Sequence, residues 1–234
     1  NLEMPASSRA LSRSSLAPIP GLRKDFDEIV TSNGIFVDRL KGTGVISRED
    51  CLRYAVTGPI LRSAGVPLGV RKAEPYLTYA ELDFDVPIGE VGDNYDRYLV
   101  CAEEMQQSLR IIEQCLARLE KLGPGPVNSF DPRVRWPAKG RVFNRMEELI
   151  QQFKSVTEGP RVPAGEAYAA IESANGELGF YLVSDGPAVP VKVRCRPPSF
   201  INLAPMPIML RGAMLADLIP TFDFINMIGG ECDR

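Results

Sequence analysis

The chain has 234 residues, of which 44% are hydrophobic and 24% are charged, enough to bury one sizeable core or two small ones. Its 27 basic and 30 acidic side chains give a net charge of -3, so it lacks the basic excess of nucleic-acid-binding proteins, and no nucleic-acid partner is expected. Because no window of about 18 apolar residues is uninterrupted, no membrane-spanning helix is expected either.

Residues 1–20 are predicted to form a basic, serine-rich extension or tail. The tract 5–24 holds five serines and four lysines or arginines without an acid, a composition typical of organellar targeting sequences. A disordered or partner-clasping tail has the same composition, so both interpretations stay open. Apolar residues at helical spacing then predict a short helix within 25–40, with Asn33-Gly34 as a break.

The next segments predict one short helix, an irregular stretch and one long helix. Residues 47–50, SRED, form a capping box that starts a helix reaching about residue 56. Residues 57–90 are too rich in Gly and Pro for long regular elements. Residues 93–122 have the clearest helical pattern, and their rhythm predicts one buried stripe made of Met105, Leu109, Ile112, Leu116 and Leu119.

The second half predicts another helix, a small sheet and a helical C-terminus. Gly123-Pro124 ends the long helix, residues 130–139 are predicted to be a loop, and helical spacing resumes over 141–156. Two strands, 167–172 and 179–183, flank Asn175-Gly176, a pair that favours positive φ, and 191–196 predicts a third strand. The last segment, 203–228, is predicted to be helical where 209–218 runs free of proline.

These elements predict an α+β fold that is mainly helical. Residues 21–234 form one unit, helical over 21–156, with a small sheet over 166–196 and a C-terminal helical segment over 203–228.

Histidine is absent, so the sequence lacks the commonest metal ligand and the commonest general base at neutral pH. The five cysteines are widely spaced and form no CxxC pair, so neither a disulfide framework nor a metal site is predicted. Any chemistry must use carboxylates, thiols or residues of a partner.

A series of short motifs in a fixed order resembles the C-terminal part of the quinone-site subunit of respiratory complex I, which is homologous to the large subunit of [NiFe]-hydrogenases. The resemblance covers roughly residues 18–234. Its strongest pieces are TGPILRSAG at 57–65, RKAEPY at 71–76, DFDVPIG at 83–89 and GDNYDRYL at 92–99. It continues through EEM at 103–105, TEG at 157–159, PAGE at 163–166, YLVSDG at 181–186, PSF at 198–200, LRG at 210–212 and GECDR at 230–234.

The resemblance implies a hydrogenase-like helical core with a small antiparallel sheet, incomplete without an N-terminal partner. It implies a core subunit of the proton-translocating NADH:ubiquinone oxidoreductase, inactive alone, that forms part of the quinone-reduction cavity. No cofactor is expected on this chain alone: quinone is the substrate, a [4Fe-4S] cluster lies in a neighbouring subunit, and NADH and FMN bind elsewhere in the complex. The expected partners are the N-terminal half of the same subunit on a separate chain, and the Fe-S-bearing and other subunits.

The resemblance also places candidate quinone-cavity residues near the C-terminus. The family has an Asp eight residues before the final Arg and an apolar residue six before it, which are Asn226 and Ile228 here; Met227 and Arg234 complete the set. Asn keeps the shape of Asp but loses its charge. In the family, the His and Tyr that donate hydrogen bonds to the quinone lie in the N-terminal half, so no complete catalytic set is expected in this chain.

Four further charged residues are interpreted as interface or structural groups: Asp96, Arg97, Arg211 and Asp217. Asp96 and Arg97 lie at the start of the long predicted helix, where an acid is favoured by the helix dipole. Arginine offers a planar, permanently charged fork that suits either a salt bridge within the subunit or a contact to a neighbour.

Two alternatives stay open at this point. The chain is either part of a working quinone site or a structural module kept for assembly. A hydrogenase is disfavoured by the lack of a CxxC pair, because two thiolates at that spacing are what grip the metal. The expected location is the matrix side of the mitochondrial inner membrane, peripheral to it, with the cytoplasmic face of a bacterial membrane as the alternative.

Overall fold

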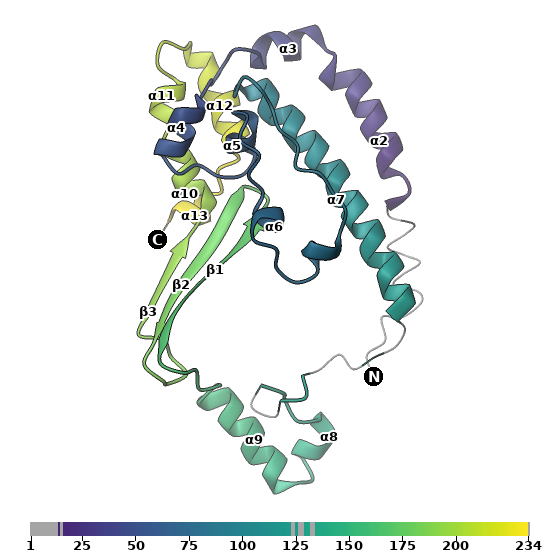
Figure 1. The fold of residues 1–234 in the computed structure, drawn as a ribbon, viewed down its shortest axis with the longest axis vertical. Coiled ribbons are helices and arrows are strands. Elements are labelled where there is room, and N and C mark those ends of the chain that lie inside the picture. Colours follow the sequence, from purple (N-terminus) through teal and green to yellow (C-terminus); the bar gives the residue numbers. More distant parts are fainter. Residues whose placement is uncertain (1–13, 15, 123–124, 126–128, 132–133, 234) are drawn as a thin grey trace.

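The computed structural model describes residues 14, 16–122, 125, 129–131 and 134–233. Most of the tail 1–20, the Gly123-Pro124 stop and Arg234 therefore lie outside the described residues. Within them the fold is α+β and mainly helical, as predicted (Figure 1). No described helix is long and apolar enough to cross a bilayer.

The N-terminal helices run beside one end of the long helix α7 (Figure 1). They are α2 (Ile19–Phe26), the π-helix η1 (Asp27–Thr31) and α3 (Gly34–Leu40). The Asn33-Gly34 break is confirmed, since the Asn33 side chain caps α3 by accepting from the backbone N–H groups of Ile35 and Phe36. Helix α4 (Arg48–Arg53) starts at the predicted cap, where Ser47 Oγ accepts from Asp50 N at 3.1 Å.

The Gly- and Pro-rich segment after α4 holds only short elements, as predicted. They are α5 (Pro59–Ser63), α6 (Val70–Ala73) and the 3-10 turn η2 (Tyr79–Glu81). Helix α5 lies at the centre of the main core, which also receives residues from α4, α11 and α12. The buried members of this core are Ile46, Cys51, Val56, Ile60, Leu61, Ala64, Met209 and Ile225.

Helix α7 (Asn94–Leu122) is confirmed as the longest element, but its predicted buried stripe is wrong. Met105 is 59% exposed, and Ile112 and Leu119 are also exposed, while only Leu116 of the five is buried. The start of α7 packs instead against α5 and α12, and its second half buries Ile111 with Leu82 and Phe84. Periodicity found the helix, but the described elements leave three of the five residues of the predicted stripe exposed.

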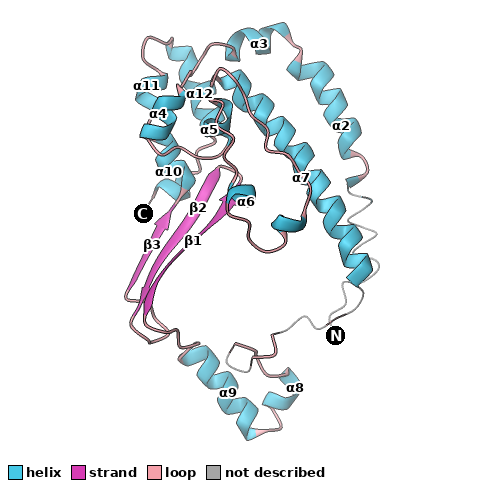
Figure 2. Ribbon diagram, in the orientation of Figure 1, coloured by secondary structure: helices cyan, strands magenta, loops and turns pink. Residues whose placement is uncertain are grey.

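The region predicted as one helix over 141–156 is two helices, α8 (Lys139–Val142) and α9 (Met146–Thr157). Three residues, 143–145, separate them. No residue of either helix is buried by the described part of the chain. Figure 2 shows the pair lying below the sheet, away from the main core.

The predicted three-stranded sheet is confirmed, with strands β1 (Gly165–Ser173), β2 (Gly176–Ser184) and β3 (Lys192–Arg196) in the order β1-β2-β3. All pairs are antiparallel, and Ala167 lies opposite Leu182, which lies opposite Val193. Because side chains alternate between faces, this register gathers apolar residues on one side, which we call the apolar sheet face. Its members are Ala167, Ala169, Ile171, Leu178, Phe180, Leu182, Val193 and Cys195.

The C-terminal helix predicted over 209–218 is wrong in position. The structure has α10 (Pro198–Leu203), α11 (Met206–Met209), the 3-10 turn η3 (Leu215–Asp217), α12 (Leu218–Ile225) and α13 (Gly229–Cys232). Gly212, with φ of 79°, lies in the turn that follows α11. Pro220 falls in the first turn of α12, where a missing N–H leaves no helical hydrogen bond unmade.

Candidate functional site

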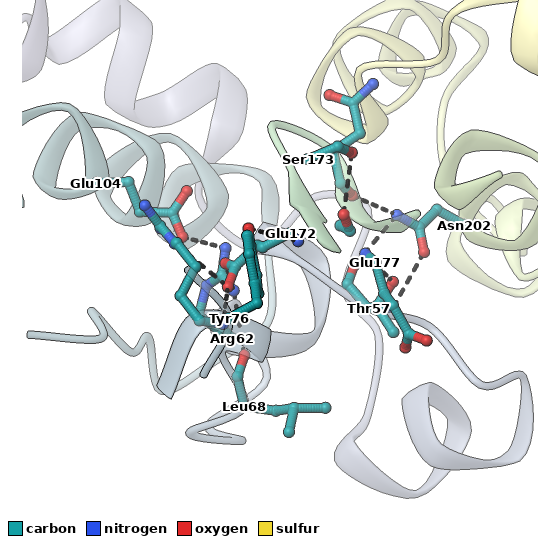
Figure 3. A network of polar contacts seen from close by, with 12 residues as sticks. Thr57, Arg62, Leu68, Tyr76, Glu104, Glu172, Ser173, Glu177 and Asn202 are labelled. Carbon is teal, nitrogen blue, oxygen red and sulfur yellow. Dashed lines mark hydrogen bonds and ion pairs between the residues drawn. The ribbon is translucent and has the colours of Figure 1, made fainter. Parts of the chain in front are cut away.

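Four charged side chains from four separate elements meet between the sheet and α7, and three of them, Arg62, Glu104 and Glu172, are labelled in Figure 3. Arg62 comes from α5, Arg71 from α6, Glu104 from α7 and Glu172 from the end of β1. The Arg62 side chain is 3% exposed and contacts both acids, through Nη1 to Glu172 Oε1 at 2.8 Å and through Nη2 to Glu104 Oε1. We call these four residues the charged cluster.

A close approach of backbone to backbone fixes the position of Arg62. Gly58 precedes α5 with φ of 75°, and a Cβ there would lie 2.5 Å from the carbonyl oxygen of Asn175 in the β1–β2 turn. Thr57 and Asn202 bond each other through two hydrogen bonds of 3.2 Å, and Asn202 also donates to the Asn175 carbonyl (Figure 3). The hairpin turn is therefore pressed against the start of α5, one turn before Arg62.

Glu172 is the most fully satisfied member of the charged cluster. Besides Arg62, its carboxylate accepts from the backbone N–H of Arg71 at 3.2 Å and lies 3.5 Å from Arg71 Nε. The Arg71 guanidinium lies 5.4 Å from the centre of the Phe84 ring, a cation–π contact that holds it in place. The Glu172 N–H donates to Tyr76 Oη at 3.2 Å, and burial raises the pKa of Tyr76.

Glu104 differs from Glu172 in both exposure and charge environment. Its side chain is 17% exposed, against 5% for Glu172, and Arg62 is its ion-pair partner. Burial raises the pKa of Glu104, and the charge of Arg62 opposes that shift. The charged cluster thus holds one acid with several donors and one acid that binds a proton more readily than an ordinary glutamate.

A pocket of about 580 Å³ opens beside the charged cluster. Its volume falls in the range of small-molecule sites. It is lined by Ile19, Arg71, Cys101, Glu104, Met105, Ser108, Leu109, Glu172, Ser173, Ala174 and Asn226.

Of the predicted cavity residues, Asn226 reaches this pocket. It ends α12 in the left-handed conformation, with φ of 54°, and its carbonyl accepts from Asn175 Nδ2 at 2.9 Å. Met227 packs against the main core, and the Ile228 N–H donates to Ser199 Oγ at 3.3 Å. The described residues therefore bring Asn226, but neither Met227 nor Ile228, to the pocket lining.

Two of the four predicted charged residues lie where α7 begins. Arg97 is fully buried and donates to the carbonyls of Gly44 at 2.5 Å and Gly92 at 3.0 Å, and to Asn94 Oδ1 at 2.7 Å. Asp96 Oδ2 accepts from the N–H of Val91 at 2.6 Å. Both side chains tie the preceding loop to the first turn of α7.

The other two lie near η3. Asp217 is buried and pairs with Arg39 of α3 at 3.2 Å, while its second oxygen accepts from Met214 N at 3.0 Å. Arg211 is exposed in the turn after α11.

Sequence reasoning did not single out Arg62, Arg71, Glu104 or Glu172. Arg62, Arg71 and Glu104 lie inside motifs that carried the resemblance, at 57–65, 71–76 and 103–105. A charged residue within the apolar run 59–64 was the available signal, because a buried Arg requires a partner. No group of three or more Cys, Asp or Glu suited to a metal ion occurs among the described residues.

The sequence of the chain is similar to proteins of one known family. The family model described as "Respiratory-chain NADH dehydrogenase, 49 Kd subunit" matches residues 2–234. An NADH-quinone oxidoreductase subunit of Myxococcus xanthus is 53% identical over 91% of this chain and 51% of its own length. An NADH-quinone oxidoreductase subunit of Sorangium cellulosum is 48% identical over 98% of this chain and 56% of its own length.

The chain thus spans about half the length of the curated relatives it matches. The match begins at residue 2 and so includes the basic, serine-rich tract. The chain belongs to the family of the 49 kDa subunit of respiratory-chain NADH dehydrogenase.

Proposed function

We propose that this chain is the C-terminal part of the quinone-site subunit of an NADH:quinone oxidoreductase. The supporting observation is the match of almost the whole chain, at about half identity, to proteins named as subunits of that enzyme. In the proposed assembly, quinone takes electrons from a [4Fe-4S] cluster in a neighbouring subunit, NADH and FMN bind elsewhere, and reduction is coupled to proton pumping. Asn226 lines the pocket of the described chain, and in the proposed assembly Met227, Ile228 and Arg234 join it in the wall of the quinone cavity.

Exposed apolar surface supports a partner that completes the fold. Much of the apolar sheet face is left exposed by the described elements, with Val193 53% exposed and Phe180 and Leu182 also exposed. On α7, Met105, Ile112 and Leu119 are exposed in the same way. A contiguous apolar patch of this kind marks an interface.

The proposed occupant of these surfaces is polypeptide equivalent to the half of the relatives that this chain does not span. That this polypeptide is a separate chain stays a prediction. Peptide mapping of the purified complex tests it, because absence of the family's N-terminal half from the complex contradicts a working quinone site.

Paired substitutions test the surface itself. Leu182→Lys and Val193→Lys place charges on the apolar sheet face, and we expect both to abolish co-purification with the other subunits. Arg194→Ala, on the opposite face of β3, is the matched control and should leave assembly intact. Assembly that tolerates both lysines contradicts the proposed interface.

A second candidate function, an assembly module without its own quinone chemistry, is favoured by one observation. Asn226 stands where the resemblance places a carboxylate, and its amide is engaged with Asn175. NADH:quinone activity that a quinone-site inhibitor blocks in the purified assembly contradicts this alternative.

The proposed location is peripheral, on the matrix side of the mitochondrial inner membrane or the cytoplasmic face of a bacterial membrane. The composition of the tract 5–24 supports the former and the bacterial relatives support the latter. Detecting the chain in purified mitochondria or in bacterial membranes of the source organism decides between them.

A further inference from the structure

The charged cluster contains two acids that compete for one arginine. Arg62 contacts Glu104 through one terminal nitrogen and Glu172 through the other, so the guanidinium bridges the two carboxylates (Figure 3). The second arginine, Arg71, contacts only Glu172 within the described cluster. Two acids and two arginines leave the cluster neutral, but the donors are divided unequally.

Because Glu104 has fewer donors than Glu172, Glu104 can accept a proton with the smaller loss of hydrogen bonds and ion pairs. Protonating Glu172 would weaken three contacts at once, because its oxygens accept hydrogen bonds from Arg62 Nη1 and Arg71 N and lie 3.5 Å from Arg71 Nε. Protonating Glu104 weakens one. Arg62 then keeps Glu172 and the carbonyl of Leu68, to which it donates at 3.1 Å.

Glu104 also faces the pocket. It lines the pocket from α7 together with Ser108, one turn further along, and with Met105, whose exposure shows that the pocket reaches the surface of the described chain. The groups that face Glu104 are Arg62 from α5, Arg71 from α6, Glu172 from β1, and Cys101 on α7 itself. Among these four groups, Glu172 carries the carboxylate.

We propose that Glu104 is the proton-exchanging carboxyl group of this pocket, alternating between a carboxylate paired with Arg62 and a neutral acid released from it. The inference rests on the proposed function, since quinone reduction is the reaction that needs the proton. Burial, which raises the pKa of Glu104, acts in the same direction as the geometry.

The proton balance is simple. Reduction of a quinone to a quinol takes two electrons, from the iron–sulfur donor of the complex, and two protons. Glu104 supplies one of these protons through the pocket, becomes a carboxylate, and pairs again with Arg62. A proton from the bulk solvent, relayed by water in the pocket, then returns to Glu104, and the cluster recovers the charge it had before the reaction. The second proton of the quinol comes from the donors that the proposed function assigns to the N-terminal half. Glu104 thereby holds one proton and delivers it through the pocket.

Glu104→Gln in the assembled complex tests this role. Glutamine keeps the acceptor oxygen for Arg62 but cannot release a proton. We expect the NADH:quinone rate to fall about 10²-fold, the lower end of the range for a lost general acid, and the pH profile to lose one of its titrating limbs. Glu104→Asp, which restores a titratable group, should recover part of the rate and the lost limb.

Glu103→Gln is the matched control. Glu103 is the preceding residue of α7, lies on the surface, and pairs with Arg23 at 3.1 Å. We expect its rate and pH profile to match those of the unmodified complex. An infrared difference spectrum on quinone reduction should show a protonated-carboxyl band that is lost in Glu104→Gln and kept in Glu103→Gln.

The outcomes separate this inference from the proposed function. If the unmodified complex reduces quinone while Glu104→Gln assembles and keeps both its pH profile and the infrared band, the role of Glu104 is wrong and the proposed function stands. If the unmodified, fully assembled complex shows no inhibitor-sensitive quinone reduction, the proposed function itself is wrong.

Discussion

Asn175 and Asn226 are joined by two hydrogen bonds, one donated by each side-chain amide. Asn175 Nδ2 donates to the Asn226 carbonyl at 2.9 Å, and Asn226 Nδ2 donates to Asn175 Oδ1. Asn175 lies in the β1–β2 turn and Asn226 caps the C-terminal end of α12, so this pair joins the sheet to the C-terminal helices at the pocket wall.

We expect Asn226→Asp to weaken this junction, because a carboxylate oxygen would replace the donor that faces Asn175 Oδ1. The predicted cost is about 1–3 kcal/mol, that of leaving a buried polar group unsatisfied. Hydrogen–deuterium exchange at residues 173–177 of the assembled protein should speed up accordingly. Asn226→Gly keeps the left-handed backbone and is the control, with a smaller effect. An Asp variant as protected as the original contradicts the junction.

Arg97→Lys is expected to be severe despite conserving charge. Lysine cannot reach the two carbonyls and the Asn94 side chain that the guanidinium fork satisfies together, and all lie in the interior. Breaking such a buried set costs about 3–5 kcal/mol. Burial lowers the pKa of Arg97 to about 10, which still leaves it charged at neutral pH. Arg23→Lys, at a partly exposed ion pair, should cost about 0–1 kcal/mol; comparable melting temperatures for the two variants would overturn the ranking.

Glu104 should make the stability of the folded chain vary with pH. Because burial raises its pKa in the folded state, the folded chain binds this proton more tightly than the unfolded chain. The stabilisation is therefore complete below the pKa of an unfolded glutamate and is lost as the pH rises through the folded pKa. The melting temperature of the assembly, measured across this range, should fall less steeply with pH in Glu104→Gln than in Glu103→Gln. Equal slopes would count against the shift.

Cys51 is predicted to resist alkylation in the native assembly. It is fully buried, and burial raises the pKa of its thiol to about 11, although the charge of Arg97 acts the other way. Mass spectrometry after iodoacetamide treatment at mildly alkaline pH should find Cys51 unmodified in the native assembly. The urea-unfolded chain is the control and should be modified at Cys51; rapid native labelling is the result that contradicts its burial.

Features that depend on neighbours in the sequence could be predicted. Ser47 caps α4, and a hairpin turn forms at Ala174-Asn175, with Gly176 as the first residue of β2, because each residue acts on its near neighbours in the sequence. The predicted buried stripe of α7 was wrong because burial depends on which other elements pack against the helix. The helix predicted over 209–218 was wrong because Gly212, with its positive φ, lies in a turn inside that proline-free run. Local sequence signals therefore predicted where helices and strands form, but they did not predict which face of each element is buried.

The candidate site likewise contains residues that the sequence could identify and residues that it could not. Asn226 was identified through a resemblance, and the structure shows it at the pocket lining. Arg62 and Glu172 are 110 residues apart, and no pattern within either segment links them. Their pairing depends on the hairpin pressing against Gly58, which only the three-dimensional structure shows.

The apolar sheet face has a consequence for how much of this protein a cell can maintain. A chain whose folded state is stabilised by a bound partner becomes more stable as the concentration of free partner rises. Copies made in excess expose Phe180, Leu182 and Val193, surfaces that chaperones and proteases recognise. In the proposed assembly, the sheet would therefore couple the abundance of this chain to that of its partner and keep the two in matched numbers without a dedicated regulator.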